Sequence, residues 1–280
     1  MGTNDIADST AGQSASASTK EIRIDGLAKT YNEGSPQSVE ALSDIDITVR
    51  DGEFLTIVGP SGCGKSTLLE IVAGLIPKSS GSVRIGDEEV TEPRPEIGVV
   101  FQEYSLFPWR TVQRNTEFGL EIMGVDKAER RDRAQAMIDL VGLSGFEEAY
   151  PDELSGGMQQ RVALARTLAA DPDILLMDEP FGALDEQTRM YMGEELLRIW
   201  AETDKTVVFI THSLQESVLL SDRVAVMSDR PGRILDVVEV ELDRPRDTDL
   251  IGTEPFNRAQ SRIWGMIRDE SDDADPPGQP

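Results

Sequence analysis

Apolar residues follow two patterns along this chain: short continuous runs, and a spacing of three or four positions. Residues 53–58, 173–177 and 206–210 are short apolar runs rich in β-branched side chains, as strands buried on both faces are. Elsewhere apolar residues return every three or four positions, which predicts helices at residues 68–76, 111–123, 126–141, 154–169, 186–200, 214–220 and 254–269. This alternation of strands with helices predicts an α/β fold.

Shorter apolar segments predict further strands at residues 22–24, 41–49, 82–85, 97–101, 223–227 and 233–240. The pattern becomes helical and polar after residue 104, so we expect a helical subdomain at about residues 104–170, inserted between two halves of the core. Residues 1–20 are polar and residues 269–280 are acidic and contain prolines, so both are expected to be disordered tails. The folded domain is then expected at residues 21–268.

The composition is that of a soluble protein. Hydrophobic residues make up 39% of the 280 residues. No apolar run approaches the roughly 18 residues that a membrane-spanning helix needs. Residues 1–19 lack the apolar core of a secretory signal, and the single Cys63 cannot form an internal disulfide. We therefore expect a cytoplasmic protein.

The charge narrows the choice of partners. With 52 acidic and 27 basic residues, the chain has a formal net charge of −25. Such a surface repels nucleic acid, so no nucleic-acid partner is expected. The acidic excess runs along the whole chain, which suggests adaptation to a salt-rich cytosol, where screening removes the self-repulsion. An acidic protein without that adaptation is the alternative.

Residues 59–67 read Gly-Pro-Ser-Gly-Cys-Gly-Lys-Ser-Thr, between a predicted strand and a predicted helix. The glycines let the backbone curl until its N–H groups point at an anion, and the helix N-terminus adds partial positive charge. Lys65 can reach the outer phosphates of a nucleotide, and Ser66 can ligate Mg²⁺. The context favours a P-loop over an ordinary glycine-rich turn. The predicted nucleotide contacts in this loop are Gly59, Pro60, Ser61, Gly62, Cys63, Gly64, Lys65, Ser66 and Thr67.

Two other predicted buried strands end in residues that can bind a metal ion or take part in catalysis. Asp178 and Glu179 follow the run at 173–177, which we expect one strand over from the P-loop and thus in reach of Mg²⁺ and water. His212, the chain's only histidine, follows the run at 206–210. A lone histidine is more often structural, but its place at the end of a core strand favours a catalytic role.

Three features stay open from the residues alone. Tyr31, expected in a polar loop, can stack on a base or anchor the loop. Gln102 at a strand end is commonly just a solvated polar residue. The glycines after Ser155 can meet an anion, or the serine can simply cap a helix.

Taken together, these motifs resemble those of the ATP-binding subunits of ABC transporters over roughly residues 20–268. The matching segments are residues 59–67 as Walker A, Gln102 as the Q-loop, 154–160 as the signature, 174–179 as Walker B, 183–185 as the D-loop and His212 as the H-loop. The resemblance implies the ABC ATPase fold, a P-loop NTPase core with a mixed or antiparallel β subdomain and an inserted helical subdomain.

The resemblance also implies roles for single residues, with ATP and Mg²⁺ as ligands. Tyr31 would stack on adenine, and Gln102 would sense Mg²⁺ and the attacking water. Asp178 would hold the metal, Glu179 would polarise the water and His212 would contact the γ-phosphate. In a homodimer, one subunit's signature and D-loop would complete the other's ATP site. Those residues are Ser155, Gly156, Gly157, Gln159 and Asp185.

Further segments look like the importer branch for nitrate, aliphatic sulfonates and taurine, which also has relatives that import thiamine-precursor pyrimidines. These segments are residues 107–112, 118–121, 211–216, 230–233 and 242–247. The branch implies two integral-membrane permease subunits, an extracytoplasmic solute-binding protein and a place on the inner face of the membrane. A soluble ABC ATPase of translation or repair is the main alternative.

The same resemblance places the permease's coupling helix against the segment after Gln102. Leu106, Phe107 and Trp109 could form an apolar patch for that helix. Alternatively, they could only pack the helical subdomain onto the core.

Overall fold

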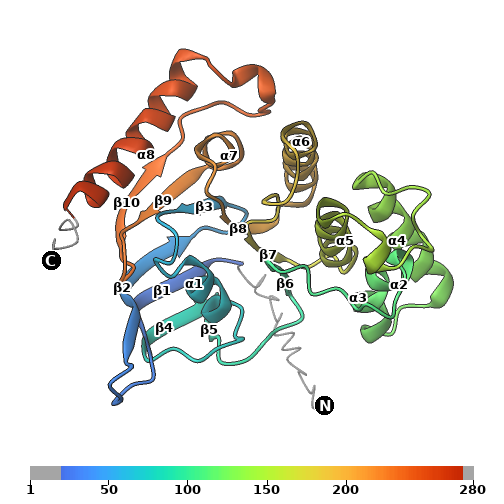
Figure 1. Ribbon diagram of the computed structural model, residues 1–280, viewed down its shortest axis with the longest axis horizontal. Coiled ribbons are helices and arrows are strands. Elements are labelled where there is room, and N and C mark those ends of the chain that lie inside the picture. The colour runs from blue at the N-terminus through green and yellow to red at the C-terminus, as the bar shows by residue number, and fades with distance from the viewer. Residues whose placement is uncertain (1–19, 274–280) are drawn as a thin grey trace, which may run out of the picture.

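Two β-sheets and a group of helices make up this computed structural model, which describes residues 20–273 (Figure 1). The segments predicted as tails, residues 1–20 and 269–280, lie largely outside the described residues. Helix α8 (Glu254–Asp273) runs past the predicted helix end at residue 269. None of the helices in residues 20–273 is both long and apolar enough to cross a membrane.

The larger sheet has six strands in the order β10-β9-β3-β8-β7-β6. All neighbouring pairs are parallel except β10 with β9. The strands are β3 (Phe54–Val58), β6 (Ile97–Val100), β7 (Ile174–Asp178), β8 (Thr206–Ile210), β9 (Arg223–Met227) and β10 (Ile234–Glu239). The buried runs predicted from sequence thus form the centre of a mostly parallel sheet, which confirms the α/β class.

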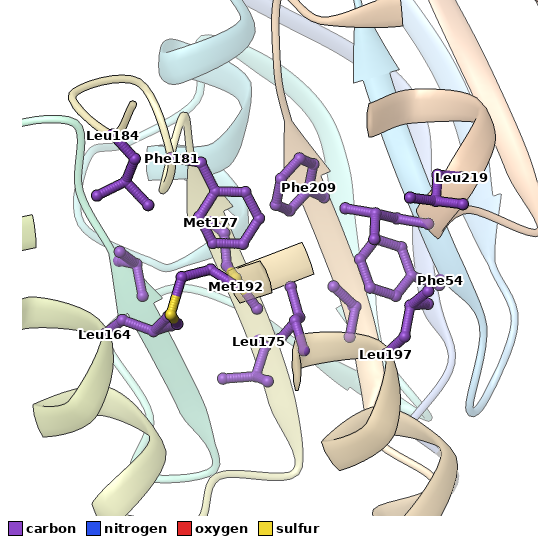
Figure 2. Close-up of a cluster of buried hydrophobic side chains, with 14 of the residues drawn as sticks. Phe54, Leu164, Leu175, Met177, Phe181, Leu184, Met192, Leu197, Phe209 and Leu219 are labelled. Atoms are coloured by element: carbon purple, nitrogen blue, oxygen red, sulfur yellow. The ribbon is translucent and has the colours of Figure 1, made fainter. Parts of the chain in front are cut away.

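Successive residues of the central strands serve two hydrophobic cores. Leu175 and Met177 of β7 face one core, and Leu176 between them faces the other. The first core lies under α5 (Gly156–Ala169), α6 (Glu186–Thr203), α7 (Leu214–Leu220) and α8. At its centre, the Phe209 ring packs 5.6 Å from that of Phe181 and 5.8 Å from that of Phe54, between centroids (Figure 2). Burial on both faces explains why these strands read as continuous apolar runs.

The smaller sheet is antiparallel, in the order β2-β1-β4-β5, and packs through the second core. Helix α1 (Lys65–Val72) contributes Leu68, Leu69, Ile71 and Val72 to that core, so it lies between the two sheets. The strands are β1 (Ile22–Tyr31), β2 (Val39–Val49), β4 (Ser80–Ile85) and β5 (Glu88–Glu89). This is the second β unit that the family resemblance implies.

The helical subdomain lies at one side of the molecule (Figure 1). It comprises α2 (Val112–Thr116), α3 (Phe118–Ile122), α4 (Lys127–Leu140), a 3₁₀ turn (Pro151–Glu153) and the start of α5. Side chains cap α2 and α4: Thr111 accepts from the Arg114 N–H and Asp126 from the Ala128 N–H. A second 3₁₀ turn (Thr248–Leu250) precedes α8.

Three sequence expectations need correction. Tyr31 ends strand β1 and is not in a loop, because β1 runs on through bulges opposite β2. Strand β7 is not next to the P-loop strand, because β8 lies between β3 and β7. The predicted helix at 111–123 is also divided into α2 and α3 at Glu117.

Candidate active site

The chemistry-bearing residues meet at one edge of the parallel sheet. The P-loop follows β3, and His212 follows the adjacent β8. Asp178 ends the next strand, β7, and Gln102 follows the strand after that, β6. Because parallel strands share one carboxyl edge, four segments distant in sequence converge at this edge.

The P-loop is held in shape by close backbone packing. Gly64 has φ +111°, and a Cβ there would lie 2.8 Å from the Ala41 carbonyl oxygen, so only glycine fits. Lys65 Nζ donates to the carbonyls of Gly59 at 2.9 Å and Pro60 at 2.8 Å. Its ammonium group therefore lies over the loop, at the start of α1. Cys63 is buried behind the loop, and burial raises the pKa of its thiol.

A cavity of about 500 Å³ opens over the loop, of a size that fits a nucleotide. The Tyr31 ring is 37% exposed, and its hydroxyl lies 3.3 Å from Thr67 Oγ1. Lys65, which carries a positive charge, and Tyr31, which is expected to stack on the base, thus border the same cavity. The lining residues are Tyr31, Asn32, Val39, Ala41, Ser61, Gly62, Gly64, Lys65, Ser66, Thr67, Gln102, Glu179, His212 and Arg230.

Asp178 fits a magnesium ligand. The residue is 6% exposed, and its Oδ1 atom has no hydrogen-bond partner within residues 20–273. Burial is the main cause that raises the pKa of this carboxyl, with Ser66 opposing it through a hydrogen bond. The described residues hold no cluster of three metal-binding side chains. That is typical of Mg²⁺ sites in which phosphates and waters complete the shell.

The Glu179 carboxylate contacts the two other predicted catalytic residues, His212 and Gln102. Its Oε1 lies 2.7 Å from His212 Nε2, and its Oε2 accepts from Gln102 Nε2 at 3.4 Å. The Glu179 backbone has φ +48°, an uncommon conformation for a non-glycine residue. The structure therefore brings the three predicted catalytic side chains into one contact group at the cavity wall.

The signature and D-loop residues do not line this cavity. Ser155 caps α5 by accepting from the Met158 N–H, and Gln159 donates to the carbonyls of Pro151 and Leu154. Asp185 caps α6, and hydrogen bonds from Thr188 lower the pKa of its carboxyl. Ser155, Gly156 and Asp185 are exposed. A nucleotide in this cavity would not touch them from the same chain.

Sequence reasoning missed two functional positions. Gln160, 2% exposed, donates to the Glu179 carbonyl at 2.9 Å and accepts from the Ala183 N–H at 2.9 Å. It thereby ties the signature helix to the turn that carries Glu179. Arg230 borders the cavity, although the sequence marked it only as part of a branch motif. No local signal reveals either contact, since each joins elements far apart in the chain.

Comparison with known proteins agrees with this geometry. The sequence profile described as "ABC transporter" matches residues 42–182. The chain is 52% identical over 250 residues to an uncharacterized ABC transporter ATP-binding protein of Methanocaldococcus jannaschii, covering 89% of this chain and 92% of that protein.

Two relatives have named substrates. The nitrate import ATP-binding protein of Synechocystis is 50% identical over 215 residues, covering 77% of this chain and 81% of that protein. The aliphatic sulfonates import ATP-binding protein of Bacillus cereus is 45% identical over 242 residues, covering 86% and 94%.

Solved structures give the same result. A bacterial ABC transporter cassette determined as a dimer superposes with a TM-score of 0.73 at 33% identity, covering 79% of this chain and 100% of that chain. A post-hydrolysis state of such a cassette, bound to ADP and phosphate, matches at the same TM-score of 0.73.

Proposed function

This chain belongs to the ABC transporter family and hydrolyses ATP with Mg²⁺, and from that premise we propose that it energises the import of a small solute of the nitrate, sulfonate or taurine type. The observation that carries the proposal is the similarity to import ATP-binding proteins, at 45–50% identity over most of the chain. Import of another solute, such as a thiamine-precursor pyrimidine, remains the alternative within the branch.

We assign the work of hydrolysis to the residues of the cavity. The P-loop N–H groups and Lys65 bind the phosphates, and Tyr31 supports the adenine. Ser66 and Asp178 hold Mg²⁺, with Gln102 beside them. Glu179 polarises the attacking water, and His212, at 2.7 Å from Glu179, orients that carboxylate and contacts the γ-phosphate. Catalysis of this kind is mainly positioning and charge stabilisation.

We further propose that two copies of the chain share two ATP sites. The exposed Ser155, Gly156 and Asp185, with the half-buried Gly157 and Gln159, do not line the chain's own cavity and would complete the partner's. The dimeric cassette to which the chain is similar supports this arrangement. Catalysis then requires a dimer.

The proposed transporter also contains two permease subunits and an extracytoplasmic binding protein, with this chain on the cytoplasmic side of the membrane. A cavity of about 470 Å³ beside Trp109, lined by residues of the helical subdomain, is the proposed docking place for the permease. Its lining mixes Arg110, Arg114, Glu117 and Glu121 with the Trp109 and Tyr150 rings.

The test is a pull-down of the tagged chain from gently solubilised membranes of its native host in molar salt. We expect a permease with several apolar helices and a binding protein among the partners. Binding of nitrate, sulfonates, taurine and pyrimidines to that binding protein would then identify the solute. Recovery of soluble partners or ribosomes alone would replace the importer by a soluble ABC ATPase.

A further inference from the structure

Arg230 reaches the tip of the P-loop from a part of the chain that carries none of the nucleotide-binding motifs. It stands on the turn between β9 and β10, and its Nε and Nη2 atoms donate to the Gly62 carbonyl oxygen at 3.1 and 2.7 Å. The two residues are 168 positions apart in sequence. Arg230 also lines the nucleotide cavity.

The turn that carries Arg230 is locked against the P-loop. A Cβ on Gly232 would lie 2.2 Å from the Cys63 carbonyl oxygen, so the two backbones are in direct contact. The Gly232 N–H donates to the Ala41 carbonyl at 3.0 Å, and the Gly232 carbonyl accepts from the Ser43 N–H at 3.0 Å. Within the turn, Ser228 Oγ accepts from the Arg233 N–H. These contacts fix the backbone from which the Arg230 side chain extends to Gly62.

The hydrogen bonds to Gly62 bear on the anion site through peptide geometry. In a trans peptide the carbonyl of one residue and the N–H of the next point in opposite directions. Holding the Gly62 carbonyl toward Arg230 therefore sets the direction of the Cys63 N–H, a backbone donor within the phosphate-binding loop. Without such a partner, the carbonyl could turn inward and oppose the phosphates with its negative end.

Arg230 also adds a positive charge to the lining of the nucleotide cavity. Lys65 and Arg230 are the permanently cationic side chains among the residues that line the cavity. Arginine carries five N–H donors, and the Gly62 carbonyl uses only the Nε and one Nη2 donor. No carboxylate within residues 20–273 forms an ion pair with this guanidinium, despite the chain's net charge of −25. The remaining donors of a side chain that lines the nucleotide cavity are thus left for a ligand.

We propose that Arg230 is a positioning residue for ATP, which orients the Gly62–Cys63 peptide and adds a second positive charge at the phosphate end of the cavity. The inference rests on ATP binding and not on the identity of the imported solute.

The test compares Arg230→Ala with Arg233→Ala. Arg233 lies three residues on in the same turn and is not among the residues that line the nucleotide cavity. It borders a second hollow with Leu235 and Glu270, which Arg230 also borders. Both variants lose one positive charge from one loop. ADP is titrated onto each, because it is not consumed and so reports binding apart from turnover. We expect Arg230→Ala to weaken ADP about tenfold, as the loss of charge-assisted hydrogen bonds does. Arg233→Ala should stay within about twofold of the parent.

A second readout separates positioning from general damage. Arg230→Ala should raise the KM for ATP with kcat within about twofold, while the Tm without nucleotide matches that of Arg233→Ala. Equal ADP affinities for the two variants, or a fall in kcat at unchanged KM, would overturn the proposal. Where Arg230→Ala is not recovered folded, Arg230→Lys replaces it: the lysine keeps the charge but loses the paired donors. A Kd unchanged in that variant overturns the positioning of the peptide.

Discussion

Glu179 is held in its uncommon backbone conformation from three sides. Its N–H donates to the Ile210 carbonyl at 3.0 Å, and its own carbonyl accepts from the Gly182 N–H at 3.0 Å and from Gln160. A positive φ at a non-glycine residue costs about 1–3 kcal/mol and persists only where the surroundings enforce it. Here the surroundings direct the carboxylate toward the cavity, so the strained backbone places Glu179 for its proposed role in hydrolysis.

Replacing Glu179 by Gln keeps the shape of the side chain and removes its charge. We expect ATP to bind with nearly unchanged Kd, because the P-loop is untouched. Turnover should fall about 10²–10⁴-fold, the usual contribution of a general base. Two copies should then stay together on ATP, visible as a dimer in size-exclusion chromatography with Mg-ATP.

Glu92→Gln is the matched control for that variant, since Glu92 is exposed and far from the cavity lining. It should turn over at the parent rate. Normal turnover of Glu179→Gln itself would remove Glu179 from its proposed role.

Asp178 gives a prediction about stability without ligand. Because burial raises its pKa in the folded state above the ordinary value, the folded chain binds this proton more readily than the unfolded chain does. The charged carboxylate therefore destabilises the fold at pH 7, and the penalty fades as the pH falls through the folded pKa. Asp178→Asn should raise the Tm at pH 7 without Mg²⁺ by about 2–4 °C, as about 1 kcal/mol does at this size.

The gain in Tm should shrink as the pH approaches 4, and thermal scans across this range measure it. Asp185→Asn is the control, since hydrogen bonds lower the pKa of that exposed carboxyl. That variant should not gain stability at pH 7. A lower Tm for Asp178→Asn than for the parent would show that the buried carboxylate is stabilised and not strained.

The residues of the cavity could largely be predicted because their types follow from the chemistry of phosphate and Mg²⁺. Lys65, Asp178 and Glu179 each stand at a strand end or loop where only a few roles are open. Gln160 and Arg230 could not be predicted, because their roles depend on contacts that only the folded chain creates.

At the scale of elements, the segment after Gln102 divides its apolar side chains between two tasks. Leu106 packs against the hydrophobic core, and the half-buried Phe107 ring lies 4.5 Å from that of Phe118, between centroids. Trp109, in contrast, is 72% exposed and borders the cavity of about 470 Å³ in the helical subdomain. The packing role is confirmed for Leu106 and Phe107, and the docking role of Trp109 stays a prediction.

Truncation of Trp109 should therefore affect coupling and not folding. We expect Trp109→Ala to keep the Kd for ATP within about twofold and to lose most solute uptake, since exposed aromatics are common anchors of interfaces. Uptake of labelled solute by cells that carry the whole transporter measures the effect. Trp264→Ala is the control, because Trp264 is 55% exposed on α8, away from the lining of the cavity of about 470 Å³. Unchanged uptake in Trp109→Ala would end the docking role.

Element positions were predictable where periodicity is strong. The central strands at 174–178 and 206–210 lie within a residue of the apolar runs, because full burial requires an unbroken run. The extent of β1 was not predictable, because its second half pairs through bulges and carries polar residues. Strand order also escaped prediction, since no local pattern tells which strand is inserted between two others.

At the scale of the molecule, surface charge outweighs paired charge. In several ion pairs of the described residues both partners are exposed, such as Arg258–Glu254 and Arg50–Glu239, and pairs of this kind contribute little. With 52 acidic residues against 27 basic ones, the net charge of −25 leaves a large excess of carboxylates that repel one another. Salt should therefore matter more to this fold than to a neutral one.

We expect the Tm to rise by about 10 °C or more between 0.1 M and 2 M KCl, because screening shortens the reach of the repulsion from about 10 Å to below about 3 Å. Sucrose is the control, since it favours compact states without screening charge. A Tm in dilute buffer equal to that in molar KCl would contradict the proposed adaptation to salt.

The central place of β3 in the sheet also determines at what stage of synthesis the chain can first bind a nucleotide. Its neighbours β8 and β9 both come from the last third of the chain, and the Phe54 N–H donates to the Asp222 carboxylate across 168 positions. At about 5–20 residues per second, a ribosome needs about 8–34 seconds to span that interval. Until residue 206 has been made, neither flanking strand is available to the P-loop strand. We therefore expect nucleotide capture to mark the completion of synthesis and not the emergence of the loop that binds it.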